Sequence, residues 1–128
     1  MKNIIFLFLF FTTLSFSQQI GAKWLSAEDN TLSVTCQGTM LEIAVWDTGA
    51  ADTIYLERIW TVDDTTLYPR VGQLKDLTTG ANVTSIIGSS DEKLYVLWVP
   101  ANARFRFFLS EYASGDVYVE ATSKLWGP

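Results

Sequence analysis

The carboxylates are the first side chains to consider for chemistry, because the chain has no histidine and a single cysteine. That composition excludes His-based triads, His-ligated metals, cysteine zinc sites and an internal disulfide. Asp63-Asp64 is an adjacent carboxylate pair, but neighbours on an extended strand point to opposite faces. This suits a solvated hairpin tip better than a shared proton, so we expect no enzyme activity.

No cofactor or metal site is expected either. The eight glycines form no phosphate-binding loop, and no spacing of aspartates matches a twelve-residue calcium loop. Only Asp47 and Asp52, at the two ends of a turn-forming segment, are candidates for an irregular cation site. Asn82-Val83-Thr84 is a glycosylation sequon, a three-residue pattern that often arises by coincidence.

Aromatic side chains offer a better basis for function, because tyrosine and tryptophan are enriched at binding surfaces. Trp46 alternates with Glu42 rather than with Leu41 and Val45, so we expect it on the solvent side of its strand. The segment 92–99 is apolar on both faces, so one of them needs a cover. The candidate binding residues are Trp46, Tyr95, Phe108 and Tyr118. The alternative is that these rings pack only on one another and on a loop.

The elements that position these residues are strands, since period-two alternation recurs from Thr31 onwards and helical periodicity is hard to find. Turn-forming residues separate the strands at spacings of about ten residues. The pattern predicts an all-β fold, an antiparallel β-sandwich or jelly roll of about eight short strands. The main expected strands are 31–36, 39–46, 53–61, 82–87, 92–99, 103–110 and 116–122.

The last two of these strands are expected to form a hairpin. With Ser110 opposite Asp116, Phe107 would meet Val119 on the inside. On the outside, Arg106 would meet Glu120 and Phe108 would meet Tyr118, so that both faces favour the same register.

Two local features leave alternatives open. A bulge at Glu57-Arg58 would redirect the end of strand 53–61, whereas an unbroken strand would point Arg58 inward. Cys36 alternates with Leu32 and Val34, which suggests a buried thiol, the other interpretation being a reactive or intermolecularly bridged one.

The first 18 residues have the features of a secretory signal. Lys2 precedes an apolar run that ends in small and polar residues, and the run is too short to span a bilayer. We therefore expect a signal peptide at 1–18 and one domain at 19–128, exported beyond the inner membrane, with no stable membrane span in the mature chain. Losing Lys2 moves the net charge from −5 to −6, which argues against nucleic acid as a partner.

The order of the motifs resembles a small β-sandwich domain of tailed-phage virion structural proteins. The matching positions are Leu56-Glu57-Arg58, Asp63-Asp64, Phe105-Arg106-Phe107 and 114–119 (SGDVYV), within a span of about 32–122. The resemblance implies no enzyme activity and a role in decorating particles or extending fibres by protein contact. The leader is similar to those of flavobacterial secreted proteins.

We therefore expect a non-enzymatic, extracytoplasmic structural or adhesive module, found in the periplasm, at the cell surface, in the medium or on a virion. It would bind a protein partner, or associate with itself, through an aromatic strand face. The alternative is a secreted carbohydrate-binding module, in which exposed tryptophan and tyrosine rings stack on a surface glycan.

Overall fold

The computed structural model describes residues 17–49, 52–111 and 115–124, and the expected leader, apart from Ser17 and Gln18, lies outside them, as does the segment 126–128. Within this part the chain forms twelve strands and no helix. The strands are β1 (Ser17–Leu25), β2 (Thr31–Cys36), β3 (Met40–Asp47), β4 (Thr53–Arg58), β5 (Trp60–Val62), β6 (Thr65–Leu67), β7 (Leu74–Asp76), β8 (Asn82–Val83), β9 (Ile86–Ile87), β10 (Lys93–Trp98), β11 (Ala103–Glu111) and β12 (Val117–Lys124).

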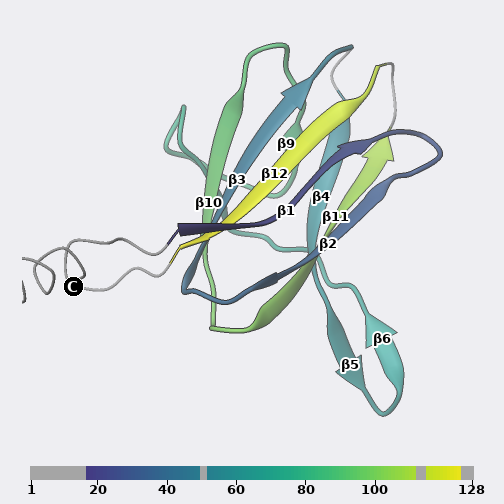
Figure 1. Cartoon of the computed structure of the whole chain (residues 1–128), viewed down its shortest axis with the longest axis vertical. Coiled ribbons are helices and arrows are strands. Elements are labelled where there is room, and N and C mark those ends of the chain that lie inside the picture. The colour runs from purple at the N-terminus through teal and green to yellow at the C-terminus, as the bar shows by residue number, and fades with distance from the viewer. Residues whose placement is uncertain (1–16, 50–51, 112–114, 125–128) are drawn as a thin grey trace, which may run out of the picture.

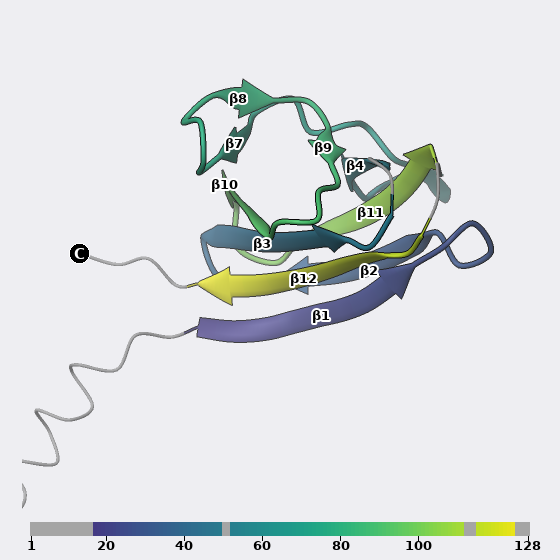
Figure 2. The ribbon, with the colours of Figure 1, turned by 90° about the horizontal axis from the view of Figure 1, so that it is seen from above.

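Two antiparallel sheets make up the body of the molecule, as Figures 1 and 2 show. The larger has six strands in the order β1-β12-β3-β10-β7-β8, and the smaller has four in the order β2-β11-β4-β9. The predicted antiparallel sandwich is confirmed. The strand count exceeds eight because β1 was not recognised in the sequence and because the expected strands 53–61 and 82–87 are each divided in two, into β4 and β5 and into β8 and β9.

A single hydrophobic core lies between the sheets, and the inward-facing side chains of each main strand are buried in it. The predicted inward residues of β3, β11 and β12 are all buried, and they are Leu41, Ile43, Val45, Phe105, Phe107, Leu109, Val117, Val119 and Ala121. Burial of apolar surface at about 25 cal/mol per Å² is the main force that holds the two sheets together.

The edge strand β1 escapes detection by alternation because it is irregular. Its register on β12 shifts between Gln19 and Gly21, so the pattern that places Leu25 inward and Trp24 outward is only a few residues long. Gly21 sits close against β2, since a Cβ there would come within 2.7 Å of Val34 Cγ1. A side chain at that position would push the two edge strands apart.

The predicted hairpin of 103–110 with 116–122 is wrong. β11 belongs to the four-stranded sheet, between β2 and β4, whereas β12 belongs to the six-stranded sheet, between β1 and β3. Phe107 and Val119 are both buried as expected, but they enter the core from different sheets. Alternation reports which residues face inward and carries no information about which strand lies alongside. The expected turn at 111–115 falls partly outside the described residues.

The true partner of Arg106 is Glu57 on β4, directly across the ladder. The Arg106 Nε and Nη2 atoms donate hydrogen bonds to Glu57 Oε1 at 3.0 and 2.8 Å. Both side chains are largely shielded from water, with 23% of Arg106 and 11% of Glu57 exposed. The predicted pairing of Arg106 with Glu120 is therefore replaced by an ion pair inside the smaller sheet.

Both open questions of the sequence are answered by the fold. β4 runs without a bulge to Arg58 and stops at Ile59, so Arg58 keeps the inward parity of Leu56. Cys36 is fully buried, with Sγ 3.4 Å from Ser123 Oγ, which confirms the interpretation of a packed thiol.

A separate hairpin of β5 and β6 extends away from the lower end of the two sheets in Figure 1. Its turn is Asp63-Asp64, with φ angles of 49° and 62° in the left-handed region that two-residue hairpins require. The predicted polar hairpin tip is confirmed, and neither carboxylate is buried.

The ion pair of Arg106 and Glu57 can be tested by exchanging the charges. Arg106→Glu should lower the free energy of unfolding by about 2 kcal/mol, because it places two carboxylates together at a largely buried position. Adding Glu57→Arg should restore part of this loss in urea unfolding. Adding Glu120→Arg instead should restore nothing, and a recovery with that variant would contradict the observed strand order.

Candidate binding site

The four candidate binding residues do not form one group. Trp46 on β3 and Tyr118 on β12 lie directly opposite each other on the outer face of the six-stranded sheet. Phe108 belongs to the other sheet, and Tyr95 points into the core. Only Trp46 and Tyr118 therefore remain as members of a common surface.

Tyr95 was expected on a contact face, and this is wrong, since only 2% of the residue is exposed. The strand β10 has two apolar faces, and the face that the smaller sheet covers carries Tyr95, Leu97 and Val99. Burial, together with the nearby Asp76 carboxylate, raises the pKa of Tyr95. The ring thus belongs to the core, and Leu94 and Trp98 on the opposite face are the exposed ones.

Phe108 lies on the outward side of β11, opposite Thr31 of β2 and Tyr55 of β4. Its ring is half-buried, and the guanidinium carbon of Arg106 is 5.4 Å from the ring centroid. The same guanidinium lies 3.5 Å from the ring of Tyr68, so Arg106 is stacked among aromatic rings. The predicted contact of Phe108 with Tyr118 is wrong, because it depended on the hairpin.

Trp24 completes the aromatic cluster and was missed in the sequence because β1 was not recognised as a strand. Its ring centroid is 5.7 Å from that of Trp46 and 5.1 Å from that of Tyr118. The rings are tilted by 56° and 51°, an edge-to-face type of arrangement that aromatic pairs favour. Trp24 and Trp46 nevertheless leave 44% and 43% of their surface exposed, so the cluster presents rings to the solvent.

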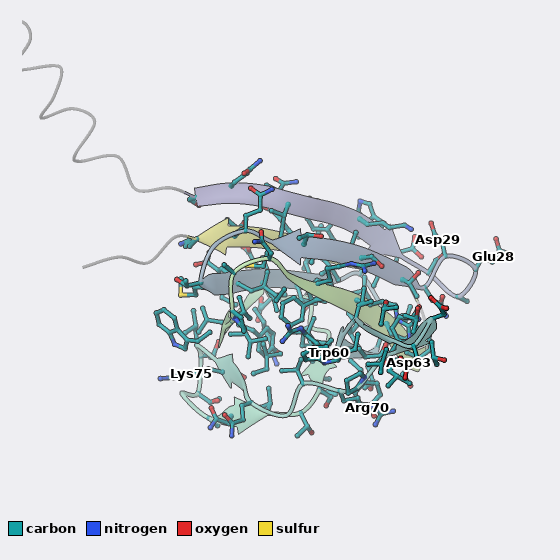
Figure 3. The ribbon with its side chains drawn as sticks, turned by 90° about the horizontal axis from the view of Figure 1, so that it is seen from below. Glu28, Asp29, Trp60, Asp63, Arg70 and Lys75 are labelled. Atoms are coloured by element: carbon teal, nitrogen blue, oxygen red, sulfur yellow. The ribbon has the colours of Figure 1, made fainter. Side chains whose placement is uncertain are left out.

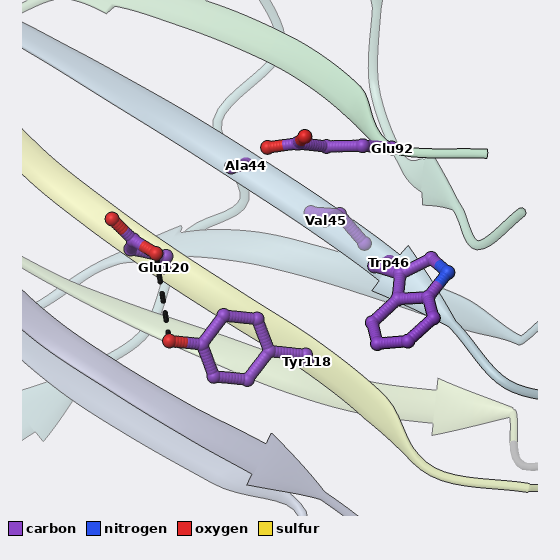
Figure 4. A pocket seen from close by; sticks show the side chains of 6 residues that line it. All are labelled: Ala44, Val45, Trp46, Glu92, Tyr118 and Glu120. Carbon is purple, nitrogen blue, oxygen red and sulfur yellow. Dashed lines mark hydrogen bonds between the residues drawn. The ribbon is translucent and has the colours of Figure 1, made fainter. Parts of the chain in front are cut away.

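A hollow of about 310 Å³ opens beside this cluster, and Figure 4 shows its walls. We call it the acidic hollow, and its lining consists of Ala44, Val45, Trp46, Glu92, Tyr118 and Glu120. The small Ala44 side chain leaves the space between the larger ones. Aromatic rings and two carboxylates therefore surround one concave surface of the sheet.

The walls of the acidic hollow are held in place by hydrogen bonds. Trp46 Nε1 donates to the Ser90 carbonyl at 2.7 Å, which ties the indole to the loop before β10. The Tyr118 hydroxyl donates to Glu120 Oε2 at 3.4 Å. Neither Glu92 nor Glu120 forms an ion pair with any residue in the described part of the chain. The hollow thus keeps two uncompensated negative charges next to aromatic faces.

Asp47 and Asp52, the candidates for a cation site, are both buried at the ends of the turn that follows β3. Asp47 is buried, and its two carboxylate oxygens accept hydrogen bonds from the backbone N–H groups of Gly49 and Asp52, each at 2.9 Å. Asp52 is buried in the same loop. Within the described ranges, no group of three or more acidic, histidine or cysteine side chains is arranged to hold a metal ion.

Comparison with known proteins adds no relative: no family model, no curated protein and no solved structure matches the chain. In residues 17–49, 52–111 and 115–124, no helix has the length and apolar character needed to cross a membrane. The chemistry of the site must therefore be inferred from its own side chains. Aromatic faces beside carboxylates attract a cation by its charge and a sugar by its hydroxyl groups and apolar face.

The buried state of Tyr95 can be tested by alkaline unfolding. Its raised pKa contributes stability that is present below pH 10 and is lost as the pH rises through the pKa of the folded state. Urea unfolding should therefore show that the native chain loses up to about 1.4 kcal/mol per pH unit more than Tyr95→Phe above pH 10. Between pH 6 and 8 the two proteins should respond equally to pH. Parallel curves above pH 10 would contradict the assignment.

Proposed function

We propose that this chain is a non-enzymatic structural or adhesive module that binds a protein partner through the exposed aromatic face of its six-stranded sheet. The observation that carries the proposal is the cluster of Trp24, Trp46 and Tyr118 beside the acidic hollow. Tryptophan and tyrosine are over-represented among the residues that contribute most to protein interfaces. Leaving two indole rings in water has no benefit for the fold of an isolated domain.

Charge indicates what the partner must supply. Glu92 and Glu120 flank the rings of Trp46 and Tyr118 in one hollow. A lysine or arginine side chain would meet both a carboxylate and an aromatic face there, and the two attractions act on the same charged group. We infer that the partner presents such a side chain at the centre of the contact.

The shape of the cluster favours a side chain over an extended polysaccharide. A flat row of coplanar rings would support stacking along a glycan, whereas the Trp24 ring is tilted by more than 50° to the rings of Trp46 and Tyr118. Tilted rings around a hollow enclose a compact group instead. We therefore rank a protein partner ahead of a polysaccharide.

A secreted carbohydrate-binding module is the second candidate, and one observation supports it. The hollow combines an indole with two carboxylates that accept hydrogen bonds, which is also how a site recognises a single sugar ring. Export beyond the inner membrane and the resemblance to tailed-phage structural domains belong to the proposal as well, since both agree with a domain that acts by contact outside the cytoplasm.

Site-specific photo-cross-linking in the cells that produce the protein would test the proposed contact. A benzophenone side chain in place of Trp46 should give a protein adduct, because residue 46 lies in the contact face. The same group in place of Ile87, an exposed residue on the four-stranded sheet, is the matched control and should give none. Glu92→Lys should reduce the adduct at position 46. Equal adducts at both positions would contradict the proposal.

Affinity electrophoresis in gels that contain polysaccharides would decide between the two candidates. If the aromatic face binds protein, the native chain should migrate alike with and without glycan. If it binds glycan, migration should be retarded, and Trp46→Ala should weaken the affinity by about tenfold or more, because stacking on the ring is lost. Trp98→Ala, which removes an exposed ring at the other end of the sheet, is the control.

A further inference from the structure

We propose that the partner of the acidic hollow is a second copy of this chain, which inserts arginine side chains from a hollow at the opposite end of the molecule. This rests on the proposed function, because it names the protein that the aromatic face would bind. It is carried by a second site that the proposed function does not use.

The second site, which we call the arginine hollow, has a volume of about 330 Å³ and lies where β4 leads into the β5–β6 hairpin. Two arginines and two exposed tryptophans form much of its lining, namely Arg58, Arg70, Trp60 and Trp98. Figure 3, seen from below, labels Trp60 and Arg70, together with Asp63 of the hairpin tip. The hollow therefore resembles the acidic one in its rings and is opposite to it in charge.

Arg58 indicates that this hollow is made for an anion. Its guanidinium lies 4.4 Å from the ring centroid of Trp60 and 5.7 Å from that of Phe105. Its Nε atom is buried and has no hydrogen-bond partner. A carboxylate that enters the hollow would meet the positive charges of Arg58 and Arg70. Neither Arg58 nor Arg70 forms an ion pair within the described residues.

The positions of the other charged residues can be compared with those of the two hollows. All four arginines belong to β4, β11 or the segment that bridges to β4, and they are Arg58, Arg70, Arg104 and Arg106. Five acidic side chains lie in the loops at the other end, namely Glu28, Asp29, Asp91, Glu92 and Asp116, whereas Asp63 and Asp64 form the tip of the hairpin beside the arginine hollow. Lys23, which is paired with Asp29, and Lys93 offset two of the five negative charges in these loops. The opposite charges thus belong to the linings of the two hollows, not to the two ends of the molecule as wholes.

The two hollows are also separated along the sheet. Tyr118 pairs with Trp46 near one end of β3, whereas Trp98 pairs with Met40 at the other end. These positions on β3 are six residues apart, a distance of about 20 Å at the rise of a strand. One copy therefore cannot join its own two hollows. A contact between different patches of identical molecules is heterologous, and it extends into a chain unless a rotation closes it into a ring.

Apolar surface accompanies the charges on both sides. The β5–β6 hairpin places Trp60, Val62 and Leu67 on one face, and each has about half of its surface exposed. A two-stranded hairpin is marginally stable in water by itself, so cover from a neighbour would stabilise it. We expect this face to pack beside Trp24 and Trp46 of the next copy while the arginines approach Glu92 and Glu120.

Complementary variants of the full chain, studied by sedimentation velocity across a concentration series, would test this assembly. Glu92→Lys with Glu120→Lys disables the acidic hollow, and Arg70→Glu, at an exposed residue, disables the arginine hollow. We expect the native chain to grow beyond its monomer mass of 14.4 kDa as concentration rises, and each variant alone to remain monomeric. An equimolar mixture should stop at a dimer, because it contains one intact pair of hollows.

Matched charge changes outside the hollows are the controls. Lys75→Glu changes the charge of an exposed residue by two units, as Arg70→Glu does, and Glu28→Lys makes at another exposed residue the change that each half of the acidic-hollow variant makes; both should leave assembly unchanged. Raising the salt concentration from 0.05 to 0.5 M should weaken the association of the native chain at least several-fold, since charge pairs drive it. Assembly that persists in both hollow variants, or that fails equally in the controls, would overturn the proposal.

The outcomes also separate this inference from the function on which it rests. A native chain that stays monomeric at all concentrations, and still gives a cross-link to a different protein at position 46, refutes the second copy and keeps protein contact. Monomers without any adduct at position 46 refute both.

Discussion

The packing of two sheets around one thin core is the constraint on which the rest of the molecule depends. Every second residue of β3, β11 and β12 is committed to that core, because side chains alternate along a strand and only one face meets the other sheet. The residues between them are left outside, where packing does not determine their type. Trp46, Glu120 and Arg106 all occupy such outward positions, so function can be read only from that second set.

The outward-facing side chains make different contacts on the two sheets. On the four-stranded sheet, arginines lie over aromatic rings, with Arg106 on Tyr68 and Arg70 on Tyr55, and Arg106 is paired with Glu57. On the six-stranded sheet, rings and carboxylates share a hollow, and Glu92 and Glu120 form no ion pair with any residue that the structure describes. In the first arrangement the charge of Arg106 is paired within the chain, whereas Arg58 and Arg70 form no ion pair with any described residue. The second leaves charge and apolar surface for a partner, which is why the proposed contact centres on it.

The fold class and the inward residues could be predicted from the sequence, whereas strand neighbours could not. Phe107 and Val119 are buried as their alternation indicates, yet they belong to different sheets. The sequence suggested Glu120 as the acidic partner of Arg106, whereas the actual partner is Glu57. Either carboxylate could pair with the guanidinium, and opposite charge alone does not show which strand lies next to β11. Of the candidate site, Trp46 and Tyr118 were placed correctly at the surface. Tyr95 was misplaced because β10 is apolar on both faces, and Trp24 was overlooked because a bulge interrupts β1.

Local patterns by themselves determined that this chain makes strands and that Cys36 and alternate β3 residues face inward, because alternation is a property of neighbouring residues. They did not show the bend at Thr84-Ser85 that divides the expected strand 82–87 between the two sheets. Only the tertiary structure decided that β1 lies against β12, that Trp24 joins Trp46 and Tyr118, and that one hollow is lined by two carboxylates and another by two arginines. Those features depend on contacts between segments far apart in the chain. Their free energy comes from the packing of whole sheets, which no short stretch of sequence contains.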